Sequence, residues 1–580
     1  MSDAQIIVSG AGPVGTCLAI DAAMRGAQVI VLEARAADDP PDAKCNTIAA
    51  RTMETFRRFG IADRVRGAGL TDDYPTDTVY ATSLSGPELT RITMPSRAER
   101  SQPGFHDSDW PTPEPMVRES QLWLEPILRE RLLSLPGVRF MPRTELVSFT
   151  QDEGGVTVTC RDLDAGEDRD LRADYLVGCD GGSSRVRKAI GARLVGDAEI
   201  GRTRTSLIRS SAVKDLFVDR RPAWMTWVVN HKVRGNVVAI DGEDLWLVHR
   251  ALPAGESDFD VLDPDQSIRD VLGVGADFPF DVVRQEDWVA RRLVADRFRD
   301  RRVFVAGDAA HLWVPFAGYG MNAGIADAVH LSWLLCAVVD GWADPAIIDA
   351  YEAERQPITE QVSRFAMSKV EENLAAMSGR SVPPVIASPG LVGRLLRRRL
   401  GRRLFDINLP QMSPEGLNFG YYYADSPIIV GDGEEAPAYD MGSHTPSTVP
   451  GCRLPHLEVD GTSILDRLGP AYTLLRLDPT VEAGPLLDSV LPVELVDTPW
   501  PSDPAFGHAL LLVRTPVAFP SADAKREGLG SGVRPPTTDE QAGCEQPDPA
   551  DAGEHPGPWR RVVPGSGHRG RRGLESPCGA

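Results

Sequence analysis

Residues 4–33 read AQIIVSGAGPVGTCLAIDAAMRGAQVIVLE, and this stretch decides the fold. It opens with the apolar run 4–9 and closes with the apolar run 27–32, which predict two buried strands. Between them a helical pattern extends to Arg25 and stops at Gly26. The stretch therefore predicts a strand, a glycine-rich turn, a helix and a second strand in direct succession.

The turn Gly10-Ala11-Gly12-Pro13-Val14-Gly15 has the glycine spacing of a dinucleotide-binding loop. Gly10 permits the tight turn, and Gly12 lets the backbone approach a pyrophosphate at the helix N-terminus. Gly15 lets helix and strand pack closely, and Glu33 at the end of the second strand can bind ribose hydroxyls. A glycine turn that binds no nucleotide is the alternative, and the complete β-α-β context argues against it.

A second site is expected where residues 303–306, an apolar run, end at Gly307 and Asp308. A loop follows, and a long apolar helix begins near Met321. Asp308 can accept hydrogen bonds from ribityl or ribose hydroxyls, and free N–H groups at the helix start can face developing negative charge. We expect the following residues around that ligand: Pro315, Gly320, Met321 and Asn322. A plain strand–turn–helix corner is the alternative for this stretch alone.

Three further positions carry polar side chains at predicted helix starts. Residues 173–178 predict a strand that ends at Asp180, followed by a serine-capped helix. Arg51 is placed to reach a phosphate, with a surface salt bridge as the alternative. Gln121 begins the helix 121–133 and could donate to a cofactor, although an exposed helical glutamine fits the composition equally well.

Apolar and polar residues alternate in runs within residues 203–251, which is typical of half-buried strands, and these runs contain Trp224, Trp227 and Trp246. A sheet with several tryptophans can form the floor of an aromatic pocket. Ordinary core packing is the alternative for each tryptophan.

Composition excludes several classes of protein. The chain has 580 residues and a formal net charge of -21, which argues against nucleic acid and against an anionic membrane surface. We find no run of 18 or more apolar residues and no signal peptide at the N-terminus, so we expect no membrane span. The 8 cysteines include no CxxC pair, so we expect no metal centre, no dithiol and a reduced, cytoplasmic protein.

From Gly416 onward the composition changes, and residues 472–478 and 508–514 predict the strands of a separate domain. Beyond about Ser521 the chain is rich in glycine and proline and should be disordered. We expect the chain to divide at these boundaries: 1–72, 111–190 and 291–400 for nucleotide binding together with long helices, 73–110 and 191–290 for a covering sheet, 415–515 for the separate domain, and 521–580 for the tail.

Three separated motifs now stand in order: the glycine loop with Glu33, Asp180-Gly181 with two arginines after it, and Gly307-Asp308. Together they resemble the FAD-dependent aromatic hydroxylases, the group of para-hydroxybenzoate hydroxylase and phenol hydroxylase, over roughly residues 4–380. Residues 415–515 resemble the thioredoxin-like domain of the phenol hydroxylase branch, without a CxxC pair. The resemblance implies an α/β fold: a Rossmann-like FAD-binding domain, an inserted β-sheet substrate domain and a thioredoxin-like C-terminal domain.

The resemblance also implies residue roles. Glu33, Ala34 and Arg35 would hold the adenosine ribose region of non-covalent FAD, and Arg51 and Gln121 its phosphate or ribityl parts. Asp180 would serve the pyrophosphate and passing NAD(P)H, Asp308 the ribityl chain, and residues 315–322 the isoalloxazine. The substrate pocket would include these side chains: Trp227, Trp246, Pro315 and Phe316.

The implied activity is aromatic hydroxylation. NADPH or NADH reduces FAD, O2 adds to give a C4a-hydroperoxide, and its distal oxygen attacks an electron-rich phenolic or polycyclic ring. The general base stays unassigned, because Asn46 stands where some relatives carry an acid and an amide cannot take that role. A flavin NAD(P)H oxidase and a non-catalytic flavin redox sensor stay open as alternatives, as does a homodimer. A flavin halogenase is disfavoured because its WxWxIP signature is missing.

Overall fold

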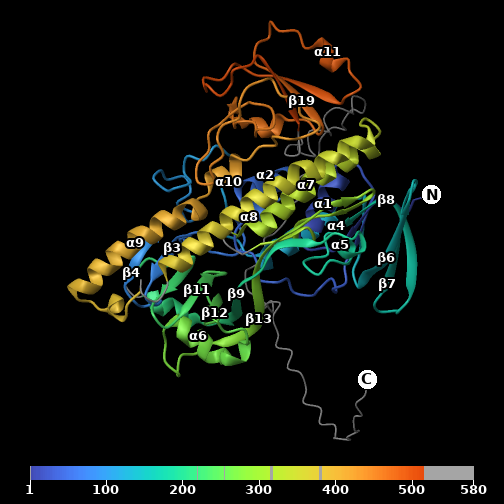
Figure 1. The fold of residues 1–580 in the computed structure, drawn as a ribbon. Coiled ribbons are helices and arrows are strands. Elements are labelled where there is room, and N and C mark those ends of the chain that lie inside the picture. The colour runs from blue at the N-terminus through green and yellow to red at the C-terminus, as the bar shows by residue number, and fades with distance from the viewer. Residues whose placement is uncertain (1, 218–219, 254, 314–317, 378–381, 515–580) are drawn as a thin grey trace, which may run out of the picture. The chain divides into compact units, whose positions relative to one another are not determined.

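The computed structural model describes residues 2–217, 220–253, 255–313, 318–377 and 382–514. Within these ranges the chain forms a largely parallel sheet, a second sheet of mostly antiparallel strands and a small C-terminal sheet (Figure 1). Pro315, Phe316 and the predicted tail 521–580 lie outside the described residues.

The first sheet contains the strands that the glycine-loop motif predicted. It consists of β1 (Ala4–Ser9), β2 (Val29–Leu32), β5 (Val138–Met141), β6 (Thr144–Asp152), β7 (Gly155–Asp162), β8 (Asp168–Gly178), β14 (Arg299–Asp300) and β15 (Val303–Val305). The order is β14-β15-β8-β1-β2-β5, and every pairing from β15 to β5 is parallel. The carboxyl ends of β1, β8 and β15 therefore meet at one edge of the sheet, where ligands bind in open α/β folds.

Helices cover this sheet. They are α1 (Pro13–Met24), α2 (Ala50–Arg58), α3 (Ala62–Arg66), α4 (Gln121–Leu133), α5 (Arg185–Ala189), α7 (Tyr319–Val339) and α8 (Ala350–Ala376), with 3₁₀ turns η3 (Gly307–Ala309) and η5 (Pro345–Asp349) between them. α1 packs against α4 and α7, and α7 packs against α8, as can be followed in Figure 1. α1 and α7 are apolar on almost every side because each lies between other elements.

α7 is long and apolar enough, by length and composition, to cross a membrane. However, 83% of its most apolar 18-residue window is buried inside the protein. α7 is therefore a buried core helix in this structure.

The second sheet receives strands from distant parts of the chain. Its members are β3 (Thr78–Ala81), β4 (Glu88–Ile92), β9 (Leu194–Arg209), β10 (Met225–Val229), β11 (Arg234–Ala239), β12 (Leu245–Ala251), β13 (Asp281–Ala295) and β16 (His311–Leu312). They lie in the order β16-β13-β9-β12-β11-β10-β3-β4. The alternating pattern of residues 203–251 predicted β10, β11 and β12, whereas β13 and β16 lie outside that pattern. β3 and β4 show that the chain leaves the first sheet early to join a second one.

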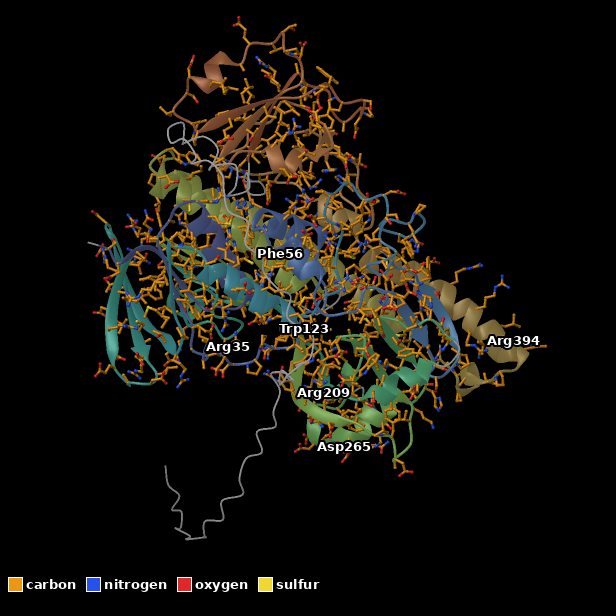
Figure 2. All side chains as sticks on the ribbon, turned by 180° about the vertical axis from the view of Figure 1, so that it is seen from behind. Arg35, Phe56, Trp123, Arg209, Asp265 and Arg394 are labelled. Carbon is orange, nitrogen blue, oxygen red and sulfur yellow. The ribbon has the colours of Figure 1, made fainter. Side chains whose placement is uncertain are left out.

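The helical elements around the second sheet are the long helix α9 (Leu391–Met412) and four shorter ones: α6 (Pro264–Leu272), η1 (Ser211–Phe217), η2 (Phe259–Val261) and η6 (Pro384–Ala387). α6 contacts β11 and β12, and α9 lies along β4. The arginine run in α9 was predicted to be a solvated helix face, and Arg394 does point away from the protein in Figure 2.

The C-terminal elements are α10 (Glu415–Phe419), β17 (Glu458–Val459), β18 (Thr462–Ser463), η7 (Ile464–Arg467), β19 (Tyr472–Arg476), α11 (Gly484–Leu487), β20 (Val493–Asp497) and β21 (Leu510–Arg514). β19 is central, parallel to β20 and antiparallel to β21. β19 and β21 confirm the two predicted strands, whereas β20 was missed because Glu494 and Asp497 interrupt its apolar pattern. Arg514 donates to both carboxylate oxygens of Glu354, at 3.0 and 2.7 Å, which ties β21 to α8.

Candidate active site

A cavity of about 1140 Å³ extends from the glycine loop to the second sheet. Ligand pockets in proteins usually measure about 300–1,000 Å³, so this cavity has room for more than one small ligand. The parallel-sheet side contributes Gly12, Pro13, Val14, Arg35, Gln121, Gly181, Asp308, Gly320 and Met321. The second sheet contributes Trp224, Trp227, Leu247, His249 and Trp288, among others.

The glycine loop has the geometry that its motif requires. A side chain at Gly10, where φ is +103°, would bring Cβ to 2.4 Å from the carbonyl oxygen of Cys179. A Cβ at Gly15 would lie 2.0 Å from the carbonyl oxygen of Gly10, so α1 can approach β1 only without a side chain there. Gly12 is different, because a Cβ there would meet no atom within 4 Å and would enter the cavity. Gly12 therefore leaves the backbone accessible to a ligand.

Acidic and basic side chains surround one end of the cavity. The carboxylate of Glu33 accepts hydrogen bonds from the backbone N–H of Ala11 at 2.7 Å and of Arg35 at 2.9 Å. The guanidinium of Arg35, labelled in Figure 2, also lies 3.3 Å from Glu125, which accepts a hydrogen bond from Gln121 at 2.6 Å. Arg35, Gln121 and Glu125 line the cavity, whereas Glu33 holds the loop from behind. Sequence reasoning missed Glu125.

Asp308 lies where β15 ends, and its side chain is open to the cavity but otherwise enclosed by protein. Burial raises the pKa of its carboxyl group above the ordinary value, and His311 and Lys44 partly oppose that increase. Arg187 donates to the carbonyl oxygen of Ala309 at 3.0 Å, so the predicted positive charge near the second motif supports the turn beside Asp308.

Asp327 of α7 lies behind this turn with 0% of its surface exposed. Its carboxylate accepts hydrogen bonds from His311 at 2.7 Å, Arg355 at 2.8 Å and the backbone N–H of Gly307 at 3.3 Å. Burial alone would raise the pKa of Asp327, but Arg355 and His311 outweigh it and lower the pKa to about 2. Sequence reasoning missed this residue, although a single acid within an apolar helix was a usable signal.

The start of α7 also faces the cavity. The helix begins at Tyr319 rather than near Met321, with Gly318 before it. The first N–H groups of a helix have no partner within it, and Gly320 and Met321, which carry two of them, line the cavity. The positive end of the helix dipole is therefore presented to a ligand.

Asn322 supports the site without lining the large cavity. Its side chain donates to the carbonyl oxygens of Thr47 at 3.0 Å and Gly318 at 2.7 Å, and accepts from the N–H of Ala49 at 2.8 Å. The amide thus joins the loop before α2 to the first turn of α7.

Two other motif residues do not line the large cavity. The guanidinium of Arg51 lies 4.7 Å from the ring centre of Tyr421 and faces a separate cavity of about 70 Å³. The carboxylate of Asp180 accepts from the N–H groups of Arg185 at 2.8 Å and Val186 at 3.2 Å. Asp180 therefore caps α5 together with Ser184, which accepts from Arg187 at 2.9 Å. The ligand contacts predicted for Arg51 and Asp180 stay predictions.

The tryptophans separate into two groups because side chains alternate across a strand. Trp246 is only 1% exposed, donates from its indole nitrogen to the carbonyl oxygen of Ser210 at 3.0 Å and does not line the cavity. Its assignment to the substrate pocket was therefore wrong. Trp227 lines the cavity and stacks on Tyr80 with 6.4 Å between ring centres. Trp288 also lines the cavity, and sequence reasoning missed it.

These residues fit FAD. Gly12 leaves space beside the N-terminus of α1 for a pyrophosphate, Arg35 and Gln121 stand at one end, and Asp308 and the start of α7 stand at the other. A second sheet with aromatic side chains closes the same cavity. The fold and the site together define the class of flavin-dependent enzymes that act on aromatic compounds.

The chain belongs to the family described as "FAD binding domain", whose model matches residues 3–366. The FAD-dependent monooxygenase apdD of Emericella nidulans is 30% identical over 547 residues, which cover 89% of this chain and 86% of that protein. Phenol 2-monooxygenase of a Pseudomonas species is 27% identical over 474 residues, covering 78% of this chain and 75% of that protein.

Among solved structures, the rebeccamycin biosynthetic enzyme RebC with reduced flavin matches with a TM-score of 0.78 and 31% identity, over 89% of this chain and 95% of that one. The flavin-dependent monooxygenase PieE in complex with FAD and substrate matches with a TM-score of 0.74 and 26% identity, over 86% and 90% of the two chains. The protein is an FAD-dependent aromatic monooxygenase, and the predicted family, fold class and FAD cofactor are confirmed.

Proposed function

We propose that this monooxygenase hydroxylates a phenolic or polycyclic aromatic compound, with O2 as the oxygen source and NADPH or NADH as the electron donor. The observation that carries the proposal is the continuity of one cavity from the glycine loop and α7 to the tryptophan-bearing sheet. The names of relatives such as phenol 2-monooxygenase and tetracenomycin B2 monooxygenase-dioxygenase support an aromatic substrate. Bound FAD supplies the transfer of electrons from NAD(P)H to O2.

The protein's own residues have distinct tasks in this proposal. The backbone N–H groups of Gly320 and Met321, in the first turn of α7, would lie beside the flavin ring of bound FAD and favour negative charge there. Asp308 orients the ribityl chain by accepting hydrogen bonds. Trp227 and Trp288 stack against the substrate ring and keep water away from the reacting atoms.

No carboxylate stands at the position where some relatives carry an acid. Asn46 lines the cavity there, and an amide cannot accept the phenolic proton. Asn46 therefore offers no base at this position, and the general base stays unassigned.

The decisive test is stopped-flow reduction of the bound flavin by NADPH and by NADH, with and without a panel of phenols and polycyclic phenols. We expect slow reduction alone, acceleration by a suitable phenol, and one atom of labelled O2 in the product. Fast reduction without any phenol, with H2O2 as the only product, would instead identify an NAD(P)H oxidase. A flavin that neither nicotinamide bleaches would identify a redox sensor.

A further inference from the structure

A polar row crosses the otherwise largely apolar floor of the cavity. Residues of neighbouring strands pair in the sequence Trp227–Asn236–His249–Thr205–Glu286, and each of them lines the cavity. The neighbouring row contains Met225, Val238, Leu247 and Leu207. His249 stands in the middle of the polar row, so its hydrogen bonds decide what the floor can recognise.

A short chain of hydrogen bonds connects Trp288, Thr205 and His249. The indole nitrogen of Trp288 lies 2.8 Å from Thr205 Oγ1, and Thr205 Oγ1 lies 2.8 Å from His249 Nδ1. An indole N–H can only donate, so Thr205 Oγ1 accepts from Trp288. Among the described residues, His249 is then the acceptor available for the hydroxyl proton of Thr205. Thr205 Oγ1 has a second lone pair and could also accept from an Nδ1–H, so the direction is an assignment: we assign the proton to the hydroxyl of Thr205, which makes His249 Nδ1 the acceptor in this chain.

This direction fixes the state of the imidazole. Burial lowers the pKa of His249 to about 4, so the ring is neutral near pH 7. A neutral imidazole carries one proton, and because Nδ1 accepts, that proton is on Nε2. In the described part of the chain Nε2 has no hydrogen-bond partner, and His249 lines the cavity. The neighbouring Asn236 also has an amide oxygen without a partner among described residues.

We propose that His249 donates its Nε2–H to an acceptor oxygen of the aromatic substrate, with Thr205 and Trp288 as positioning residues that fix the tautomer. The proposal rests on the function proposed above and specifies its substrate class: a ring that carries a carbonyl oxygen or a phenolate oxygen. His249 is then not the missing base, since its only free nitrogen already holds a proton. It stabilises the phenolate or ketone form by a hydrogen bond in a dry site, where such bonds matter most.

The test compares three probes that share one tricyclic skeleton: fluorene, its ketone fluorenone, and a hydroxyfluorene with the hydroxyl group on an aromatic ring, which is a phenol. Their binding to the FAD-loaded protein is measured by the change in flavin absorbance or protein fluorescence. We expect His249→Phe to weaken fluorenone and hydroxyfluorene about tenfold, the value of one lost hydrogen bond, and to leave fluorene unchanged. The two oxygenated probes distinguish the carbonyl from the phenol as the preferred source of the acceptor oxygen.

Thr205 offers a matched pair of variants. Thr205→Val removes the hydroxyl group at nearly constant volume, and Thr205→Ser retains it. We expect Thr205→Val to reproduce the selective loss of the oxygenated probes and Thr205→Ser to behave like the parent protein. The tautomer of His249 can be measured by nitrogen NMR of protein labelled at histidine, with the His249 signal assigned by its loss in His249→Phe. We expect the Nε2–H tautomer in the parent protein and a mixture of the Nε2–H and Nδ1–H tautomers in Thr205→Val.

An Nδ1–H tautomer in the parent protein would overturn the proposal, and so would equal weakening of all three probes or a failure of both oxygenated probes to bind more tightly than fluorene. None of these measurements requires turnover. A protein that passes them but shows no phenol-stimulated flavin reduction would retain the His249 assignment and lose the hydroxylase function, which keeps the two outcomes separate.

Discussion

The glycine loop permits a test that separates ligand contact from protein packing. Gly12 and Gly15 belong to the same motif, but their surroundings differ. A Cβ at Gly12 would meet no protein atom within 4 Å and would enter the cavity, whereas a Cβ at Gly15 would lie 2.0 Å from the carbonyl oxygen of Gly10. A side chain at Gly12 should therefore obstruct FAD only, and a side chain at Gly15 should also disturb the fold.

This geometry gives the expected changes in FAD affinity and in the free energy of unfolding. Gly12→Val places three carbon atoms where the pyrophosphate would lie, and a steric conflict of this kind costs about 1–3 kcal/mol. The affinity for FAD should then fall roughly tenfold to a hundredfold. In Gly15→Ala the backbone of β1 or α1 must shift, because no relaxed Cβ contact is as short as 2.0 Å. Its free energy of unfolding should fall along with its FAD affinity.

The assay is FAD titration of the deflavinated protein, followed by flavin fluorescence, with thermal unfolding of the same preparations without FAD. Gly12→Val should unfold at the temperature of the parent protein and bind FAD weakly, and Gly15→Ala should fail both measurements. Undiminished FAD affinity in Gly12→Val would refute the placement of the cofactor beside Gly12. A parental unfolding temperature in Gly15→Ala would show that the close contact between α1 and β1 is wrong.

Three further results are expected. Asp327→Asn should lower the free energy of unfolding by about 3–5 kcal/mol, because it leaves Arg355 buried without its counter-charge, and urea denaturation measures this. Since the pKa of Asp327 falls from 3.8 to about 2 on folding, its charged form contributes on the order of 2 kcal/mol to the free energy of unfolding above about pH 4. This contribution is lost as the pH falls towards 2. The corresponding loss of stability in acid should therefore be absent in Asp327→Asn. Trp246→Ala should cost about 3–5 kcal/mol of stability, whereas Trp227→Ala should mainly raise KM for the aromatic substrate in steady-state assays. Asp308→Ala should release most of the FAD on gel filtration without unfolding the protein, and full retention would contradict its contact with the ribityl chain.

The cofactor end of the cavity was largely predictable because its signals are local. The glycine spacing, the flanking apolar runs and the acid after the second strand all lie within residues 4–33. The structure reproduces them as β1, α1 and β2 with the strand bounds only slightly changed. Each of these signals depends on residues that are close in sequence, so a single stretch of sequence contains all the information needed to predict the glycine loop.

The substrate end could not be predicted in the same way. Alternation along β12 shows that Trp246 and Leu247 face opposite sides, but not which side faces the cavity. Buried apolar residues stand on both faces of β12, so hydrophobicity does not separate the two faces: Leu247 and His249 line the cavity, and Trp246 does not. The face is decided by how distant strands pair, which no single stretch encodes.

The roles of the charged motif residues show a related limit. Glu33 and Asp180 are predicted to contact the cofactor, and in the structure their carboxylates accept backbone hydrogen bonds that hold the loop and cap α5. A motif identifies the type of residue at a position but not the group that it contacts. A carboxylate can accept a hydrogen bond from a ligand hydroxyl or from a backbone N–H, so both contacts require the same residue type. Distinguishing them needs the position of the cavity, which depends on the second sheet.

The two ends of the cavity can therefore change independently. Glycines and backbone N–H groups form much of the cofactor end, and few substitutions there leave space for the same ligand. The substrate end consists of side chains on β9, β10, β11 and β12. The backbone hydrogen bonds between these strands do not depend on which residue faces the cavity. We expect substitutions at His249 or Leu247 to alter the aromatic compound accepted without loss of FAD affinity, which we assign to residues such as Gly12 and Asp308. Two relatives that are each 27% identical to this chain are named for different phenols, phenol and 2,4-dichlorophenol.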